Sequence, residues 1–329
     1  MGKIFRALVT AVFVAGILAA AYFYMAVTGK NQYAHILEIK SGVPLIRSLQ
    51  QLPGARSLPF RLYLKYFRDG GRKIKAGYYS IQGEKSVIEI IDLLEHGMDR
   101  IFKLTIPEGY TLEQIVNHLE KEGRIRREKF FEALMKKRES FPYETPEGNF
   151  EGYFYPETYF IPENAGEDIV VDTILHEFTR RFPPENWPDK KEFYKKLIMA
   201  SILEREAMLD SEKPLMSSVF YNRLKKGMKL ASDATVNFVF HYEKKRILYK
   251  DLEVDSPYNT YRNEGLPPAP ICNPDALSIE AAWSPADTDY LFFVAKGDGG
   301  HFFSKTYKEH LQFQNQNKKN QNTANKNKK

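Results

Sequence analysis

The sequence predicts an α+β protein that combines a single N-terminal transmembrane helix, a small α/β module and a larger, mixed α+β domain. Three observations lead to this prediction. An uncharged segment opens the chain, short strand-like and helix-like segments alternate over residues 35–97, and helical segments with a few strands fill residues 101–313. The chain has 329 residues, 43% of them hydrophobic, so it is long enough for an anchor and two modest domains.

The opening segment has the length of a membrane span. Residues Ala7–Val27 carry no charge, and a helix of this length covers roughly 30 Å, the thickness of one hydrocarbon core. Lys3 and Arg6 precede it, so the positive-inside rule predicts a cytoplasmic N-terminus and an extracytoplasmic remainder. The alternative is a cleaved signal peptide with a cleavage site near Ala19–Ala21, but the apolar regions of signal peptides are shorter. We therefore predict an uncleaved, single-pass anchor over residues 1–30.

The next predicted domain is a membrane-proximal α/β module over residues 31–100. Apolar alternation predicts its strands, and serine caps with apolar residues at helical spacing predict its helices. The expected elements are a strand over His35–Ile39, helices over Val43–Leu52 and Pro59–Phe67, a strand over Lys75–Ile81 and a helix over Ser86–Glu95.

The third predicted domain covers residues 101–313 and is richer in helix. Its expected elements are a strand over Phe102–Ile106, helices over Thr111–Leu119, Ile169–Phe182, 189–209 and 213–225, and a strand over Tyr290–Val294. Thr111 with Gln114, and Asp189 with Glu192, have the spacing of helix N-caps. The aromatic-rich segment Glu144–Pro162 is expected to be irregular. Residues 314–329 consist mostly of Lys, Asn and Gln, which predicts a disordered tail.

The distribution of charge excludes several classes of protein. The net charge is +6, but the basic excess lies in the two ends, and the body between them is slightly acidic. This distribution argues against a nucleic-acid-binding domain. Cys272 is the single cysteine, so the chain can form no internal disulfide and no zinc site from cysteine pairs. The sequence also lacks a P-loop, a dinucleotide fingerprint, a G-x-S-x-G elbow and a zincin motif.

One carboxylate stands out in the helix predicted over 189–209. Glu206 shares a helical face with Met199, Ile202 and Leu203, so it lies on the strongest apolar stripe of that helix. Burial raises the pKa of a carboxyl, and a raised pKa suits a general acid at neutral pH. Glu204 points to another side of the helix. The alternative is structural, in which Glu206 pairs with an arginine or caps a buried amide.

Several spaced motifs together make the chain recognisable. They are Met199–Glu206, Ser218–Leu224, Glu151–Tyr159, Leu230–Val236, Tyr258–Tyr261, Gly265–Pro268 and Gly299–His301 followed by Phe303 and His310. In this order they resemble the blocks of the endolytic murein transglycosylase family (MltG, or YceG-like). The resemblance covers roughly residues 35–313 and the anchor. The chain departs from the usual family residues at Ala207, Ala234 and Ala269, none of which is the proposed acid.

The resemblance implies a lyase of the bacterial inner membrane that cuts peptidoglycan from within. It would cleave the bond between N-acetylmuramic acid and N-acetylglucosamine in nascent strands, leave 1,6-anhydro ends and terminate strand elongation. It further implies a LysM-like module over 31–100, a YceG-like catalytic domain over 101–313, association with peptidoglycan synthases and no metal or organic cofactor. Glu206 aligns with the essential acid of the family.

Polar and aromatic residues of the same motifs are the candidates for substrate binding. They are Asn222, Arg223, Asp233, Thr235, Tyr258, Asn259, Thr260 and Glu157. We expect Arg223 to contact the glycan rather than the acid, because an adjacent guanidinium would lower the pKa of Glu206.

Two other functions remain open from the sequence. The first is a non-catalytic scaffold that binds the wall or a division complex. The second is a glycoside hydrolase in which Asp233 or Glu157 activates water, as two-carboxylate enzymes do. The ends of the products distinguish a lyase from a hydrolase.

Overall fold

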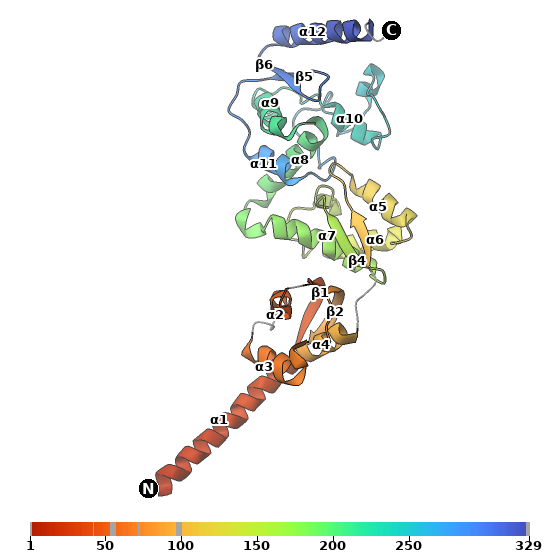
Figure 1. The fold of residues 1–329 in the computed structure, drawn as a ribbon. Coiled ribbons are helices and arrows are strands. Elements are labelled where there is room, and N and C mark those ends of the chain that lie inside the picture. The colour runs from red at the N-terminus through yellow and green to blue at the C-terminus, as the bar shows by residue number, and fades with distance from the viewer. Residues whose placement is uncertain (1, 42, 53–56, 72, 97–100, 327–329) are drawn as a thin grey trace. The chain divides into compact units, whose positions relative to one another are not determined.

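The computed structural model describes residues 2–41, 43–52, 57–71, 73–96 and 101–326. The chain divides into two compact units. The first comprises Met1–Leu104 and Tyr159–Thr173, and the second comprises Thr105–Thr158 and Ile174–Lys329. Helices and short two-stranded sheets occur in both, so the predicted α+β class is confirmed (Figure 1). The predicted end of the module at residue 100 lies outside the described residues.

Helix α1 (Gly2–Thr28) opens the chain and contains a segment, Leu8–Thr28, that is long and apolar enough to cross a membrane. The first unit continues with a mixed set of short elements. They are β1 (Lys30–Ile39), α2 (Leu45–Ser48) with a 3₁₀ turn over Leu49–Gln51, α3 (Leu58–Phe67), β2 (Gly77–Ser86) and α4 (Val87–His96). Strands β1 and β2 form a two-stranded antiparallel sheet in which Lys30 pairs with Ser86 and Ile39 with Gly77, with α2 and α3 lying between the strands in the chain.

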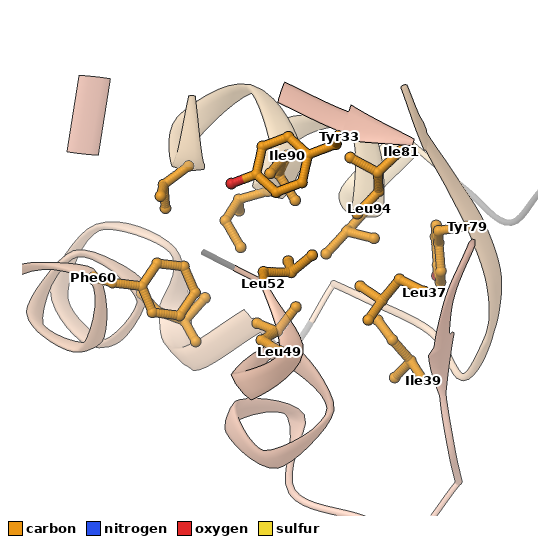
Figure 2. Packing of buried hydrophobic residues seen from close by; sticks show 13 residues of the cluster. Tyr33, Leu37, Ile39, Leu49, Leu52, Phe60, Tyr79, Ile81, Ile90 and Leu94 are labelled. Atoms are coloured by element: carbon orange, nitrogen blue, oxygen red, sulfur yellow. The ribbon is translucent and has the colours of Figure 1, made fainter. Parts of the chain in front are cut away.

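The core of the first unit lies between this two-stranded sheet and the helices of the unit. Figure 2 shows apolar side chains from both strands meeting those of α3 and α4. Tyr33, Leu37 and Ile39 come from alternate positions of β1, so they share one face of the sheet. On α4, the predicted helical spacing is confirmed, because the buried residues are Val87, Ile90, Ile91 and Leu94. Ser86 caps this helix by accepting from the Glu89 N–H at 3.3 Å.

Strands β3 (Ile101–Thr105) and β4 (Thr158–Pro162) form a second two-stranded sheet. The second unit is mainly helical. Its helices are α5 (Leu112–Lys121), α6 (Arg127–Lys137), α8 (Lys190–Glu206), α9 (Lys213–Lys225), α10 (Asp233–Val239), α11 (Ala276–Trp283) and α12 (Tyr307–Lys326), with α7 (Glu167–Arg181) beginning in the first unit. Strands β5 (Phe292–Ala295) and β6 (His301–Ser304) form an antiparallel hairpin.

Helix α8 is the central element of the second unit. It begins where predicted, because Asp189 accepts from the Glu192 N–H at 2.9 Å. Every residue from Leu197 to Leu203 is buried, and α9, α10 and α11 pack against the helix (Figure 1). It ends at Glu206 rather than at residue 209, because Ala207 already has an extended backbone. Glu206, the last residue of α8, therefore follows a closely packed and buried stretch of the helix.

The aromatic segment before β4 packs, through Phe178, against the N-terminal part of α8. Tyr153 is fully buried, and its ring lies 5.0 Å from that of Phe178, which in turn packs against Phe193 of α8. Gly152, the residue before Tyr153, has a φ of 93°, and an added Cβ would lie 2.9 Å from Pro270, so only glycine fits where the segment passes Pro270. The segment was expected to be irregular, and most of it is, although its end forms β4.

Two further predictions need correction. Strand β1 starts at Lys30 rather than His35, because pairing with β2 extends the sheet through polar residues that lack an apolar alternation. The tail from residue 314 was predicted to be disordered, but α12 continues through Lys326. The segment contains no glycine or proline that would stop a helix, and the start of α12 is capped by Thr306, which accepts from the Glu309 N–H at 3.2 Å.

Candidate active site

The predicted acid, Glu206, is the last residue of α8 and is partly buried. Met199, Ile202 and Leu203, on the same face, are completely buried, so the apolar stripe on which the prediction rested exists. The Glu206 Oε1 atom accepts a hydrogen bond from the Ser232 hydroxyl and lies 3.5 Å from the backbone nitrogen of Ala234. Both donors belong to the start of α10, which therefore orients the carboxyl.

A network of hydroxyl groups holds Ser232 in place. The Ser232 backbone nitrogen donates to Thr260 Oγ1 at 3.1 Å, and the Thr235 hydroxyl donates to the Ser232 carbonyl at 2.8 Å. The Thr235 and Thr260 hydroxyls lie 2.8 Å apart and are buried. Ala231 precedes them with a φ of 48°, a left-handed conformation that costs a residue with a Cβ of the order of 1–2 kcal/mol. This turn aims the Ser232 hydroxyl at the acid instead of at its own helix, where it makes no cap.

The surroundings of Glu206 favour its protonated form. Burial raises its pKa above the ordinary carboxyl range, and the nearby charge of Asp233 acts in the same direction. The hydrogen bonds from Ser232 and Ala234 and the nearby His301 lower the pKa, so they oppose the effect without cancelling it. Among the described residues, no arginine forms an ion pair with Glu206. Its neighbour Arg205 instead lies 4.0 Å above the Tyr242 ring.

Glu204, two residues earlier in α8, has a different environment. Its Oε2 atom accepts from the Ser278 hydroxyl at 2.6 Å and from the Asp275 N–H at 3.1 Å, at the start of α11. Lys213 lies 3.5 Å from the same oxygen and donates to both Asp275 oxygens at 3.0 Å. All these groups are buried or nearly so, so they form a structural ion cluster. The prediction that Glu204 and Glu206 do not share a site is confirmed.

Four of the predicted site residues gather around Ser232: Glu206, Asp233, Thr235 and Thr260. Asp233 is the first residue of α10 and is exposed. Its Oδ1 atom accepts a hydrogen bond from the Tyr261 hydroxyl at 2.6 Å. Burial raises the pKa of Tyr261, so this phenol stays protonated and remains a donor. Asp233 is therefore a second carboxylate close enough to influence Glu206, in a more hydrated position.

Asn222 and Arg223, on α9, use their donors on backbone carbonyls. The Asn222 amide donates to Thr288 at 2.7 Å and to Tyr290 at 3.0 Å. Arg223 donates through Nε to Leu291 at 2.7 Å and through Nη1 to Leu230. These bonds fix the segment before β5 and the segment before α10. Contact of either side chain with substrate stays a prediction.

The remaining candidates also have structural partners. Asn259 is completely buried and donates to the carbonyls of Leu252 at 2.9 Å and Val254 at 2.8 Å, which closes its own loop. Tyr258 packs against Phe238, with 4.8 Å between ring centroids. Glu157 is exposed and pairs with Arg181 at 2.6 Å. Their proposed roles toward substrate are likewise untested by these contacts.

Sequence analysis missed two contributors to the site. Ser232 lay inside a quoted motif, but nothing in the local pattern indicated a contact with a residue 26 positions away. Glu212 was not singled out at all. It accepts from the His301 backbone nitrogen at 2.9 Å and lies 2.7 Å from His301 Nδ1, which holds the imidazole near Glu206. The Gly-Gly-His motif was the available signal, because Gly300 allows the close approach of Glu212, 3.1 Å from an added Cβ.

Comparison with known proteins agrees with the motifs. The sequence model of the YceG-like family matches residues 37–316. A crystal structure of a yceG-like protein from Listeria monocytogenes matches with a TM-score of 0.57 at 30% sequence identity, covering 86% of this chain and 98% of that one. The resemblance drawn from the sequence is therefore confirmed.

Two curated relatives carry the name endolytic murein transglycosylase. The protein of Bacillus subtilis (strain 168) is 38% identical over 273 residues, which cover 76% of this chain and 74% of the relative. The protein of Streptococcus pneumoniae serotype 2 (strain D39) is 29% identical over 288 residues, which cover 77% of this chain and 52% of the relative. This chain thus spans about half the length of the pneumococcal protein.

Proposed function

Because this chain belongs to the YceG-like family, we propose that it is an endolytic peptidoglycan lytic transglycosylase. It cleaves the bond between N-acetylmuramic acid and N-acetylglucosamine in nascent glycan strands and leaves 1,6-anhydro ends. The names of the relatives support this function. The observation that carries it is the partly buried Glu206, which is held by Ser232 and has a raised pKa.

Glu206 acts first as an acid and then as a base. In its protonated form it donates a proton to the oxygen that bridges the two sugars, and the bond to the leaving sugar breaks. The carboxylate that results is stabilised by the Ser232 hydroxyl. It then takes the proton of the muramyl C6 hydroxyl, whose oxygen attacks C1 of the same sugar. The attacking group belongs to the substrate, so proximity replaces a second carboxylate and no water is consumed.

The environment of Glu206 suits both steps. Burial raises the pKa of Glu206 and so favours the protonated form, which is the form that donates the proton at the start of cleavage. The Ser232 hydroxyl and the Ala234 N–H lie where they stabilise the negative charge that appears during cleavage. Glu204 also accepts from two donors, but Lys213 lies 3.5 Å from it, whereas Glu206 forms no ion pair with an arginine among the described residues.

Asp233 is the residue on which the hydrolase alternative depends. It is exposed, lies near Glu206 and could activate water, which would produce reducing ends. Glu157 is a weaker candidate because Arg181 neutralises it at 2.6 Å. The scaffold alternative requires no acid at position 206.

The proposal also covers placement in the cell. The segment Leu8–Thr28 anchors the chain in the cell membrane, with the N-terminus in the cytoplasm and the catalytic residues outside, where the wall lies. Residues 31–100 act as a LysM-like module that binds glycan close to the membrane. Synthases that elongate the strands are the proposed protein partners, because the enzyme acts on their product.

The test compares three forms of the full chain in detergent with nascent, uncrosslinked glycan strands. They are the wild type, Glu206→Gln and the matched control Glu204→Gln, in which a structural acid of the same helix loses its charge. Mass spectrometry identifies the ends of the products. We expect anhydro ends from the wild type and from Glu204→Gln, and none from Glu206→Gln.

Three other outcomes argue against the proposal. Reducing ends would identify a hydrolase and make Asp233→Asn the next variant. Equal cleavage by Glu206→Gln would make Glu206 structural. Binding without cleavage by the wild type would support a scaffold. The Glu204→Gln control tests whether any loss of activity comes from damage to α8. If both variants lost activity, the loss would reflect a disturbed helix and not the removal of the acid.

A further inference from the structure

Helix α3 of the first unit has two apolar faces. Phe60 and Leu64 point into the core. Leu58, Leu62 and Tyr66 point outward and are 67%, 36% and 67% exposed. The three outward residues follow one another at intervals of four, so they form a continuous line along the helix. A line of exposed apolar side chains of this kind marks an interaction surface rather than scattered surface residues.

The orientation of this outward line is fixed. Arg68, which follows α3, donates to Glu95 at 2.9 Å and forms a second ion pair with Asp92, both on α4. It also donates to the Tyr63 hydroxyl at 2.9 Å. These bonds tie the end of α3 to α4, so the helix cannot turn the line of Leu58, Leu62 and Tyr66 toward the core.

The end of α3 lies against the apolar helix α1. The ring of Phe67 is 6.3 Å from the ring of Phe23, and Val27 is buried by the first unit. Figure 1 shows α3 beside the end of α1. Phe23 precedes the last residue of the candidate span, Thr28, by five residues, which corresponds to a depth of about 8 Å along the helix. If α1 spans a membrane, Phe67 therefore lies at the depth of the interface between the lipid chains and head groups.

The charges of α3 suit a lipid surface. Arg61 and Lys65 flank one side of the outward line, and α3 contains no acidic residue. Lys65 Nζ lies 5.0 Å from the centre of the Tyr66 ring. Basic side chains beside apolar ones are typical of helices that lie in a membrane interface, because the long side chains reach anionic head groups while the apolar groups enter the lipid.

We propose that α3 is an interfacial helix whose line of Leu58, Leu62 and Tyr66 inserts into the outer leaflet beside α1. The occupant of the exposed face is lipid, including anionic phospholipid that Arg61 and Lys65 attract. The proposal rests on the membrane anchor of the proposed function but not on its catalysis. It gives the first unit a second attachment to the membrane in addition to α1.

The experiment measures the depth of α3 in the full chain, reconstituted into vesicles of phosphatidylcholine and phosphatidylglycerol. Leu62→Cys and Tyr66→Cys each carry an environment-sensitive fluorophore, and Glu84→Cys, at an exposed position of β2, is the matched control. The native Cys272 is completely buried, and labelled wild-type protein corrects for any reaction there. One quencher is a lipid with a nitroxide near its head group, and the other is aqueous iodide.

We expect the lipid nitroxide to quench the probes at 62 and 66 several-fold more strongly than the probe at 84, and iodide to show the reverse order. The double variant Arg61→Glu/Lys65→Glu should weaken the quenching by lipid in anionic vesicles. Probes at 62 and 66 that behave like the probe at 84 would overturn the proposal. Protection from both quenchers would also overturn it, because a protein would then cover the face. If the chain did not float with the vesicles, α1 would not be a membrane anchor and the proposal would be overturned. Cleavage of glycan strands is measured separately and tests the proposed function alone.

Discussion

The substitution Ser232→Ala isolates the contribution of one hydroxyl to the acid. Ser232 donates to Glu206 and makes no side-chain cap for α10, so alanine removes a single interaction. The backbone bonds of residue 232 with Thr260 and Thr235 are kept. The change in the free energy of unfolding should therefore stay within about 1 kcal/mol.

The magnitude of the catalytic effect follows from the strength of that bond. A hydrogen bond to a charged group contributes about 1.5–3 kcal/mol, and it stabilises only the ionised carboxyl of Glu206. Because one pKa unit corresponds to about 1.4 kcal/mol, the pKa of Glu206 should rise by about 1–2 units in the variant. Proton donation creates the same carboxylate, so the rate at the plateau should fall by about 10- to 100-fold.

The assay follows the formation of anhydro ends from about pH 5 to about pH 9. Activity that needs protonated Glu206 is lost as the pH rises through its pKa, so the alkaline limb of Ser232→Ala should lie at higher pH than that of the wild type. The matched control is Ser278→Ala, which removes an equivalent hydroxyl from Glu204 at 2.6 Å. This control should lose stability and keep the wild-type pH profile. The reasoning is refuted if Ser232→Ala keeps both the wild-type rate and the wild-type limb.

Four predictions concern stability. Burial raises the pKa of Glu151 to about 8, so the folded state favours its protonated form. The free energy of unfolding should then fall by up to about 3 kcal/mol between about pH 5 and pH 7. Urea titrations at each pH should find a smaller fall in Glu151→Gln. Lys213→Ala leaves Glu204 and Asp275 buried without their cation and should cost about 3–5 kcal/mol by the same titration, whereas a loss below about 1 kcal/mol would contradict the cluster. Asp189→Ala removes the cap of α8 and should cost about 1 kcal/mol, measured by calorimetry. Ile91→Ala leaves a cavity in the core of Figure 2 and should cost about 2–5 kcal/mol, and a neutral result would contradict the packing described.

Local patterns predicted the helix that carries the acid. The Asp189 cap and the apolar spacing up to Glu206 depend on residues within one helix, where periodicity reports directly on burial. The same reasoning separated Glu206 from Glu204, and the structure confirms that separation. The partner of Glu206 was not predictable in this way. Ser232 reaches it through a left-handed Ala231 and a hydroxyl network with Thr260, both of which depend on the tertiary fold.

Polar residues of the loops were harder to interpret. Asn222, Arg223 and Asn259 were selected for substrate contact by residue type and resemblance, but their donors satisfy backbone carbonyls. A domain with much irregular chain has many carbonyls without strand partners, and buried side-chain amides and guanidinium groups supply the donors. The extents of β1 and α12 were missed for a related reason, because strand pairing and an uninterrupted helix do not require an apolar pattern.

The central claim is that Glu206 works without a second carboxylate, because the C6 hydroxyl of the substrate replaces water. Cleavage of nascent strands by the full chain in water enriched in oxygen-18, followed by mass spectrometry of the new ends, tests this claim most directly. The account predicts 1,6-anhydro ends that contain no oxygen-18. Oxygen-18 at C1 of the new muramyl ends would contradict it and would assign the activation of water to a second group such as Asp233.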